Sequence, residues 1–161
     1  MARESSLWAS FAKSARREIS ADELHMSRVE NLMGAGFPDV EGYYNAPWWL
    51  ELKSSERPAR PTTPVRFKLR NREEQIEWLR KRWELGGNAF FLLQVGSGAQ
   101  RILYLAPGNV GDDLKRGIPE ARLACLCIGT GVFKPPFSSK DILNRVVSCR
   151  NSPYRKSLFQ S

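Results

Sequence analysis

The sequence predicts an α/β fold in which a mixed central β-sheet is flanked by helices. Apolar residues recur at helical spacing in three separate segments, residues 4–17, 71–85 and 138–148. Residues 88–95 form a continuous apolar run of strand length, which is typical of a strand buried on both faces. Residues 37–53 hold two shorter strand-like runs separated by a turn. A hairpin and further strands alternating with helices indicate a mixed sheet with helical layers.

The first half of the chain is predicted to contain a helix and a hairpin. In the helix at 4–17, Leu7, Trp8 and Phe11 share one face and basic residues occupy the rest. Residues 24–32 fit a strand or a helix, and that choice stays open. The strands at 37–44 and 48–53 are predicted to pair as a hairpin. Three prolines within residues 58–64 exclude regular structure, so we expect a mobile basic loop at 54–66.

The second half of the chain begins with the clearest helix, at 71–85, which Asn71 can cap and a glycine pair ends. Three apolar strands follow, at 88–95, 101–106 and 123–128. The last helix, at 138–148, starts with the Ser-x-x-Asp pattern of a capping box.

Length and charge bound the organisation and the partners. The 161 residues suit one domain, which we place at 1–150, followed by a basic tail at 151–161. The net charge of +8 favours a polyanionic partner, nucleic acid first and an anionic membrane second. No apolar run reaches the roughly eighteen residues that a membrane span needs, and the N-terminus lacks the apolar region of a secretory signal. We therefore expect no membrane-spanning segment, and of the two polyanionic partners we expect nucleic acid and no membrane.

The three cysteines indicate a reducing compartment, because their number is odd and no secretory signal precedes them. Cys125 and Cys127 are separated by one residue, which is not the spacing of a zinc ligand pair, and His25 is far away in the sequence. If residues 123–128 are a strand, both thiols lie on one buried face.

The stretch GFPDVEGYYNAPWWLELKSS, residues 36–55, carries the candidate chemistry. In a strand, Glu51 and Lys53 point the same way while Leu52 points into the core, and a hairpin lets Asp39 approach Glu51. Two carboxylates become favourable neighbours when they share a hard cation such as Mg²⁺, and the carbonyl of Leu52 could supply another oxygen. Lys53 could then orient or deprotonate a water molecule, or neutralise a phosphate.

A simpler interpretation of the same residues stays open. Glu51 and Lys53 could be a solvated pair on an edge strand, and Asp39 could be a turn residue after Pro38.

A basic segment directly follows this stretch and is the candidate DNA-binding surface. Its cations are Arg57, Arg60, Arg66, Lys68, Arg70 and Arg72. They could neutralise several phosphates, although a solubilising loop would have the same composition. The adjacent Trp48 and Trp49 face opposite sides of their strand, so one is expected in the core and the other could stack on a base or fill an interface.

Pro38-Asp39 followed by Glu51-Leu52-Lys53 resembles the PD-(D/E)XK nuclease superfamily, and most closely the phage nucleases of the VRR-NUC and Holliday-junction-resolvase-like group. The resemblance covers about residues 23–95. Three further stretches match in order: Arg28-Val29-Glu30-Asn31, Gly36-Phe37-Pro38-Asp39-Val40, and Gly86-Gly87-Asn88-Ala89-Phe90-Phe91.

The resemblance implies a restriction-endonuclease-like core and an Mg²⁺-dependent endonuclease, with Mn²⁺ as a possible substitute. Asp39 and Glu51 would bind the metal, and Lys53 would serve the attacking water. Glu30 would be an additional acidic ligand, and Gln75 would contact the lysine or the scissile phosphate. For Glu30 and Gln75 the alternative is a solvated helix position.

The resemblance also implies a branched DNA substrate, as in DNA recombination, and a homodimer encoded by a phage and acting in the host cytosol. The first helix, with Trp8 and Phe11, is a candidate contact between subunits.

Three other functions remain open at this point. The chain could be a nonspecific or restriction-type endonuclease, a non-catalytic nucleic-acid-binding module on the same fold, or a small basic structural or inhibitory protein without a metal. The complete set of Asp39, Glu51 and Lys53 favours an enzyme over the other two. The absence of an added specificity domain in this short chain favours recognition of DNA shape over DNA sequence.

Overall fold

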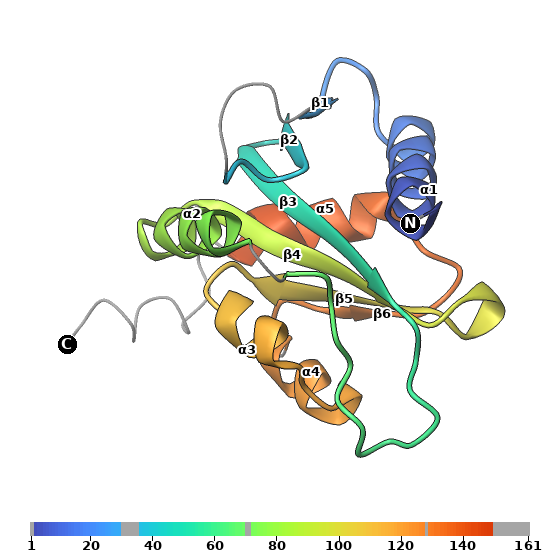
Figure 1. Cartoon of the computed structure of the whole chain (residues 1–161). Coiled ribbons are helices and arrows are strands. Elements are labelled where there is room, and N and C mark those ends of the chain that lie inside the picture. Colours follow the sequence, from blue (N-terminus) through green and yellow to red (C-terminus); the bar gives the residue numbers. More distant parts are fainter. Residues whose placement is uncertain (1, 30–35, 70–71, 128, 150–161) are drawn as a thin grey trace.

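The computed structural model describes residues 2–29, 36–69, 72–127 and 129–149 (Figure 1). At its centre is a six-stranded mixed sheet whose strands follow one another in chain order. The strands are β1 (His25–Arg28), β2 (Val40–Tyr43), β3 (Pro47–Ser55), β4 (Asn88–Val95), β5 (Ile102–Pro107) and β6 (Val132–Phe133). Only β3 and β4 are parallel among these neighbouring pairs. A parallel pair needs a long crossover, and here the crossover carries α2 (Glu73–Glu84).

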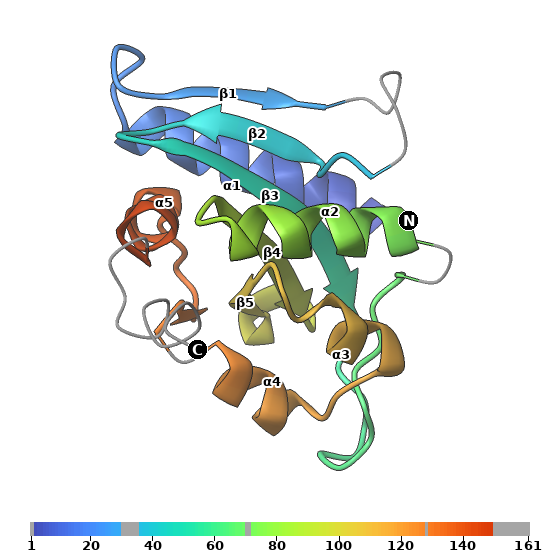
Figure 2. The same cartoon turned by 90° about the vertical axis from the view of Figure 1, so that its left-hand side faces the viewer.

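Helices cover both faces of the sheet, which confirms the predicted fold class (Figure 1, Figure 2). α1 (Ala2–Glu18) and α5 (Ser139–Ser148) pack on one face with the apolar side chains of β3. α2, α3 (Gly111–Arg116) and α4 (Glu120–Leu126) supply the apolar cluster on the other face. The short 3-10 helix η1 (Gly98–Gln100) lies in the connection from β4 to β5.

The alternation of side chains along β3 gives this strand one apolar face and one mixed face. Trp48, Leu50 and Leu52 are buried in the cluster formed with α1 and α5. Trp49 packs against the opposite cluster, so Glu51 and Lys53 share its face. The prediction that the two tryptophans face opposite sides, with one in the core, is therefore confirmed.

Gly42 makes room for the buried indole of Trp48. The two residues are partners in the register of β2 and β3. A Cβ atom at position 42 would lie 2.2 Å from the ring of Trp48, closer than atoms in contact can approach. Only glycine therefore fits opposite this side chain.

The three long helices and the hairpin predicted from the sequence are confirmed, with shifts at their ends. β2 begins at Val40 rather than at residue 37, because Gly36 has a φ of +103° and Pro38 offers no N–H to a sheet partner. The described part of residues 24–32 contains the strand β1. Ser138 caps α5, where its side chain accepts a hydrogen bond from the backbone N–H of Asp141. Asn71 and the tail at 151–161 lie outside the described residues.

The predicted strand at 123–128 is wrong, because this segment lies mostly in helix α4. Leucine, alanine and arginine favour a helix, and the acidic Glu120 in the first turn stabilises its N-terminus. Residues two positions apart on a helix point in different directions. Cys125 is consequently exposed while Cys127 is buried, so the predicted shared face of the two thiols is also wrong. All three cysteines are free thiols.

The predicted loop at 54–66 is shorter in the structure, because β3 continues to Ser55 and Val65 forms a bridge with Ile118. Residues 56–64 contain neither helix nor strand, as predicted, and both ends of this loop are held to the rest of the fold. Arg57 donates hydrogen bonds to Glu120, and Val65 forms an isolated bridge with Ile118. Within the described part of the chain, no helix has the length and hydropathy required to cross a membrane.

The aromatic residues of the first helix pack into the core. Phe11 is buried within the core, with its ring 6.4 Å from that of Trp48 in an edge-to-face contact, and Trp8 packs against the same cluster. Phe11 therefore packs in the core of its own chain, and the prediction that the first helix is exchanged or makes contact between subunits stays a prediction.

Candidate active site

The two carboxylates of the motif meet across the β2–β3 pair. Val40 is opposite Leu50 in the register, so Asp39, the residue before β2, lies opposite Glu51. The backbone N–H of Asp39 donates to Glu51 Oε2 at 3.1 Å, and the backbone N–H of Leu52 donates to Asp39 Oδ2 at 2.9 Å. These reciprocal hydrogen bonds hold the carboxylates side by side, as the hairpin predicted.

Glu51 and Lys53 form a buried ion pair in the middle of the sheet. The side chain of Glu51 is fully buried and that of Lys53 is 7% exposed, with Nζ 3.0 Å from Glu51 Oε1. β3 has a neighbour on each side, β2 and β4. The interpretation of this pair as a solvated contact on an edge strand is therefore wrong.

The electrostatics of Glu51 favour its neutral form. The pKa of Glu51 is raised to about 8, first by burial and then by the charge of Asp39, with Lys53 acting in the opposite direction. A cation placed between Asp39 and Glu51 would relieve their repulsion and restore the ionised form.

The oxygen atoms gathered here suit a hard divalent cation. Besides the two carboxylates, the carbonyl of Leu52 lies on the same edge of β3 as its N–H, which donates to Asp39. Mg²⁺ takes such oxygen ligands and completes its shell with water or phosphate. Among the described residues, no third His, Cys, Asp or Glu joins Asp39 and Glu51. Glu30, the predicted additional ligand, lies outside the described residues.

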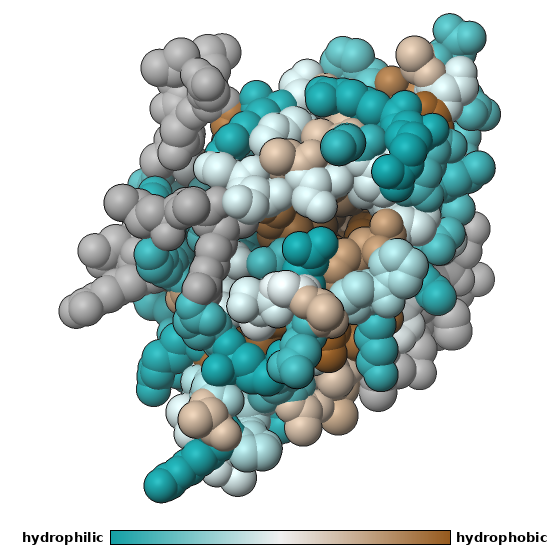
Figure 3. Space-filling model, turned by 90° about the vertical axis from the view of Figure 1, so that its right-hand side faces the viewer, coloured by the Kyte–Doolittle hydropathy of each residue, from teal (hydrophilic) through white to brown (hydrophobic). Residues whose placement is uncertain are grey.

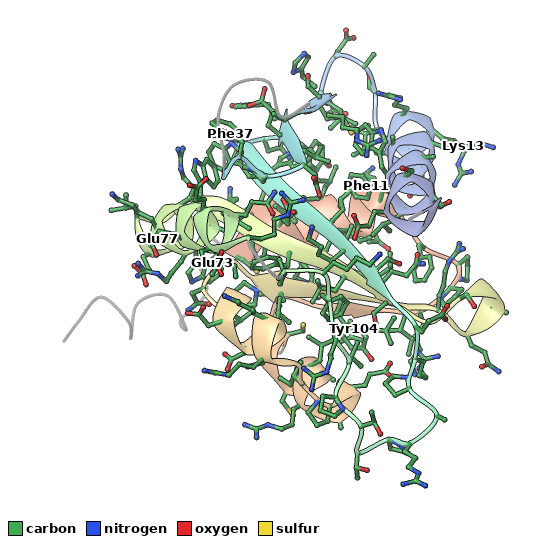
Figure 4. The ribbon with its side chains drawn as sticks, in the orientation of Figure 1. Phe11, Lys13, Phe37, Glu73, Glu77 and Tyr104 are labelled. Carbon is green, nitrogen blue, oxygen red and sulfur yellow. The ribbon has the colours of Figure 1, made fainter. Side chains whose placement is uncertain are left out.

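The N-terminal turn of α2 brings Gln75 to the same site. Gln75 is buried, and its Nε2 donates to the backbone carbonyl of Phe37 at 3.5 Å, next to Pro38 and Asp39. Its Oε1 is buried without a partner in the described structure. Figure 4 shows Phe37 close to α2, from which Glu73 and Glu77 also project. The sequence thus identified a residue that the fold places beside the motif, and the interpretation as a solvated position is wrong.

The predicted DNA-binding cations differ in their exposure to solvent and in their hydrogen bonds to the rest of the chain. The guanidinium of Arg57 donates to Glu120 and to the carbonyl of Gln100, so it fastens the loop to the fold. Arg66 is exposed and donates to the carbonyl of Arg116. Three of the remaining cations are exposed: Arg60, Lys68 and Arg72. Arg70 lies outside the described residues.

Arg57 belongs to a network that the sequence did not reveal. Glu120 accepts hydrogen bonds from Arg57 and from the hydroxyl of Tyr104, the latter at 2.7 Å. The three residues come from the loop after β3, from α4 and from β5. Sequence separations of 16 and 63 residues leave no local pattern from which this network could be predicted.

Two hollows differ in their capacity for a ligand. One, on the side seen in Figure 3, lies between α1 and the β4–β5 hairpin and measures about 30 Å³, which is room for little more than water. The other measures about 450 Å³ and is lined by residues of β3, α2 and the loop that follows α2, among them Trp49, Trp78 and Arg82. The second hollow has the volume of a small-molecule site.

No protein-family model matches this chain, and no curated protein matches it.

Proposed function

We propose that the chain is an Mg²⁺-dependent DNA endonuclease that acts on branched DNA in the manner of a Holliday-junction resolvase. The observation that supports this most is the meeting of Asp39 and Glu51 across β2 and β3, with the ammonium of Lys53 3.0 Å from Glu51. A carboxylate pair beside a lysine, within a mixed sheet flanked by helices, is the arrangement that the resemblance to PD-(D/E)XK nucleases implies.

Each residue has a defined part in this proposal. Asp39, Glu51 and the carbonyl of Leu52 would hold Mg²⁺, which when bound neutralises phosphate charge and lowers the pKa of a coordinated water. Lys53 orients the attacking water or stabilises the charge on the phosphate. Gln75 positions Lys53 or the phosphate from α2. Glu30, which directly follows Val29, is proposed as an additional acidic ligand.

The charge of the chain supports DNA as the substrate. Two carboxylates would repel a phosphate backbone unless cations lie nearby, and the net charge is +8. Arg60, Lys68 and Arg72 are exposed on the segment that follows the motif strand. They give a salt-dependent affinity for DNA that does not depend on sequence. The free thiols fit a reducing cytosol, and a dimer would let two sites cut two strands of a junction.

The test is cleavage of a four-way junction and a linear duplex of matched sequence, each with Mg²⁺, Mn²⁺ or EDTA. Glu51→Gln and Lys53→Met remove one charge each from the site while keeping side-chain size. Glu41→Gln, on an exposed position of β2, and Lys13→Met, which projects outward from α1 in Figure 4, are the matched controls. We expect cleavage by the controls and a loss of at least 100-fold in both site variants.

The pattern of products decides between the candidate functions. Metal-dependent paired nicks in the junction alone support the resolvase proposal. Equal cutting of both DNAs keeps the metal site and overturns the preference for branches. DNA binding without cutting in any divalent metal overturns the enzyme and favours the non-catalytic module.

A further inference from the structure

The larger hollow, here called the indole cavity, is built from aromatic and cationic side chains. Its lining includes Trp49, Trp78, Lys81, Arg82 and Asn88, and its volume is about 450 Å³. The two indole rings meet edge to face, with centroids 5.8 Å apart. The guanidinium carbon of Arg82 lies 4.6 Å from the centroid of each ring. Indole faces and a stacked guanidinium are surfaces on which a planar ring can stack.

The cations of the cavity form no ion pair with a carboxylate of their own helix among the described residues. The pKa of Glu77 is lowered first by its hydrogen bond from Arg80, and the charge of Lys81 is the last of its causes. Arg80 forms ion pairs with both Glu77 and Glu84, in which its guanidinium nitrogens lie 2.5 Å and 3.0 Å from the carboxylate oxygens. Lys81 and Arg82 have no carboxylate partner among the described residues. Two unpaired cations beside two indoles suit a ligand that is both aromatic and anionic.

Asn88 adds an unsatisfied polar atom to the lining. Its side chain is almost fully buried, and its Nδ2 donates to the carbonyl of Pro47 at 3.0 Å, which fixes the amide. Its Oδ1 has no hydrogen-bond donor in the described structure. A buried acceptor without a partner costs about 1–3 kcal/mol, so a ligand with an N–H group at its edge would gain by filling it.

The indole cavity is next to the candidate active site. Trp49 precedes Glu51 by two residues on the same face of β3, a distance of about 7 Å along a strand. Phe37, close to Asp39 in the chain and 37% exposed, has its ring centroid 5.3 Å from that of Trp78. An aromatic path therefore leads from the carboxylates to the cavity.

We propose that the indole cavity binds an unpaired nucleobase of the DNA strand whose phosphate lies at Asp39, Glu51 and Lys53. One indole face stacks on the base while the other indole meets the edge of the base, because the two rings are inclined at 67° to each other. Asn88 accepts from the edge of the base, and Lys81 and Arg82 contact the adjoining phosphate. A simple anion would not need the indoles, and a purely apolar ligand would leave Asn88 and Arg82 unsatisfied. The inference rests on the proposed nuclease function, and it names the feature of branched DNA that the protein recognises: an unstacked base.

The test measures binding in EDTA, so that it is independent of cleavage. Three fluorescein-labelled DNAs are compared by anisotropy: a perfect duplex, a duplex with one unpaired nucleotide, and the same duplex with an abasic sugar at that position. The last two carry the same number of phosphates, so they differ only in the base. We expect the protein to bind the DNA with the unpaired nucleotide on the order of ten-fold more tightly than the DNA with the abasic sugar, which is the typical effect of one base–aromatic stack. Trp49→Ala and Arg82→Ala are expected to abolish this difference.

Arg80→Ala is the matched control, because it removes the same charge from the same helix two residues away from Arg82. It should weaken binding to all three DNAs equally and keep the preference for the base. Trp49→Phe, which retains a ring, should keep most of the preference and shows that loss in Trp49→Ala is not a folding defect. Equal affinity of the wild-type protein for unpaired and abasic DNA overturns the inference, as does an Arg80→Ala protein that behaves like Arg82→Ala.

The outcome for the nucleobase is separable from the outcome for the nuclease. A wild-type protein that cuts DNA with Mg²⁺ but shows no preference for the base loses only this inference. A protein that prefers the base but cuts nothing keeps the nucleobase site and loses the proposed enzyme.

Discussion

Replacing Glu51 by glutamine should remove a pH dependence of folding that the buried carboxyl imposes. The change keeps the size of the side chain and an oxygen that can accept from the backbone N–H of Asp39. It removes the group whose pKa is raised to about 8, first by burial and then by the charge of Asp39. The free energy of unfolding of the metal-free wild type should therefore fall with rising pH where that of Glu51→Gln does not.

The sign and the size of this pH dependence of the free energy of unfolding follow from the proton bound by Glu51. Between pH 4.5 and about 8 the folded protein holds a proton on Glu51 that the unfolded chain has released, so unfolding becomes easier as the pH rises through this window. A rise of the pKa from 4.5 to about 8 corresponds to about 5 kcal/mol. Glu51→Gln also removes the partner of Lys53, which lowers the stability of the variant. Near pH 8 we therefore expect the wild type to have lost about 2–5 kcal/mol more of its free energy of unfolding than the variant, relative to low pH.

The assay is urea unfolding of both proteins in EDTA at several values between about pH 5.5 and 8.5, followed by tryptophan fluorescence. This window avoids other shifted groups. Every other described carboxyl with a shifted pKa has it lowered, as hydrogen bonds from Arg57 lower that of Glu120. Burial raises the pKa of Cys127 to about 12, so it also titrates outside the window.

Parallel pH profiles for the two proteins would refute the reasoning, because they would mean that Glu51 stays ionised as the partner of Lys53. A second result bears on the metal. If Asp39 and Glu51 bind Mg²⁺, adding it near pH 8 at a hundred times its dissociation constant should raise the free energy of unfolding of the wild type by about 2.7 kcal/mol. The free energy of unfolding of Glu51→Gln should not change.

Two further substitutions test how the scaffold is held. Gly42→Ala places a Cβ atom 2.2 Å from the ring of Trp48, so urea unfolding should show a loss of at least about 1–3 kcal/mol. The double variant Gly42→Ala/Trp48→Phe should recover part of this loss, and wild-type stability of Gly42→Ala would contradict the packing described. Tyr104→Phe removes the hydroxyl that donates to Glu120 at 2.7 Å and should cost about 1–2 kcal/mol in the same assay. Tyr43→Phe, on an exposed position, should cost nothing, and an equal loss in both would rule out the network.

The fold could be predicted as far as local periodicity reaches. The helices α1, α2 and α5 and the run of β4 each carry a pattern long enough to identify the element. The six residues at 123–128 do not, because a short apolar run fits a strand and a buried helix equally well. The helix α3 and the two-residue strand β6 are shorter still, and their conformation depends on the residues that pack on them.

The candidate site divides in the same way. The approach of Asp39 to Glu51 follows from the hairpin, which is a local structure. The complete burial of Glu51 could not be predicted, because it depends on the pairing of β3 with β4, in which Glu51 is opposite Phe91, 40 residues further along the chain. The contact of Trp49 with Trp78 and Arg82 likewise requires the crossover to lay α2 over β3. Each tryptophan by itself was indistinguishable from a core residue.

The strict alternation along β3 means that correct folding and assembly of the candidate site are the same event. A slip of one position in the pairing of β3 would turn Glu51 and Lys53 toward α1 and α5, and Leu50 and Leu52 toward Asp39. Such a misregistered chain would bury two charges in an apolar layer and would display no carboxylate pair. Any molecule in which Asp39 and Glu51 lie side by side therefore has β3 paired in the correct register. Metal binding at this pair would therefore report the correct register of β3.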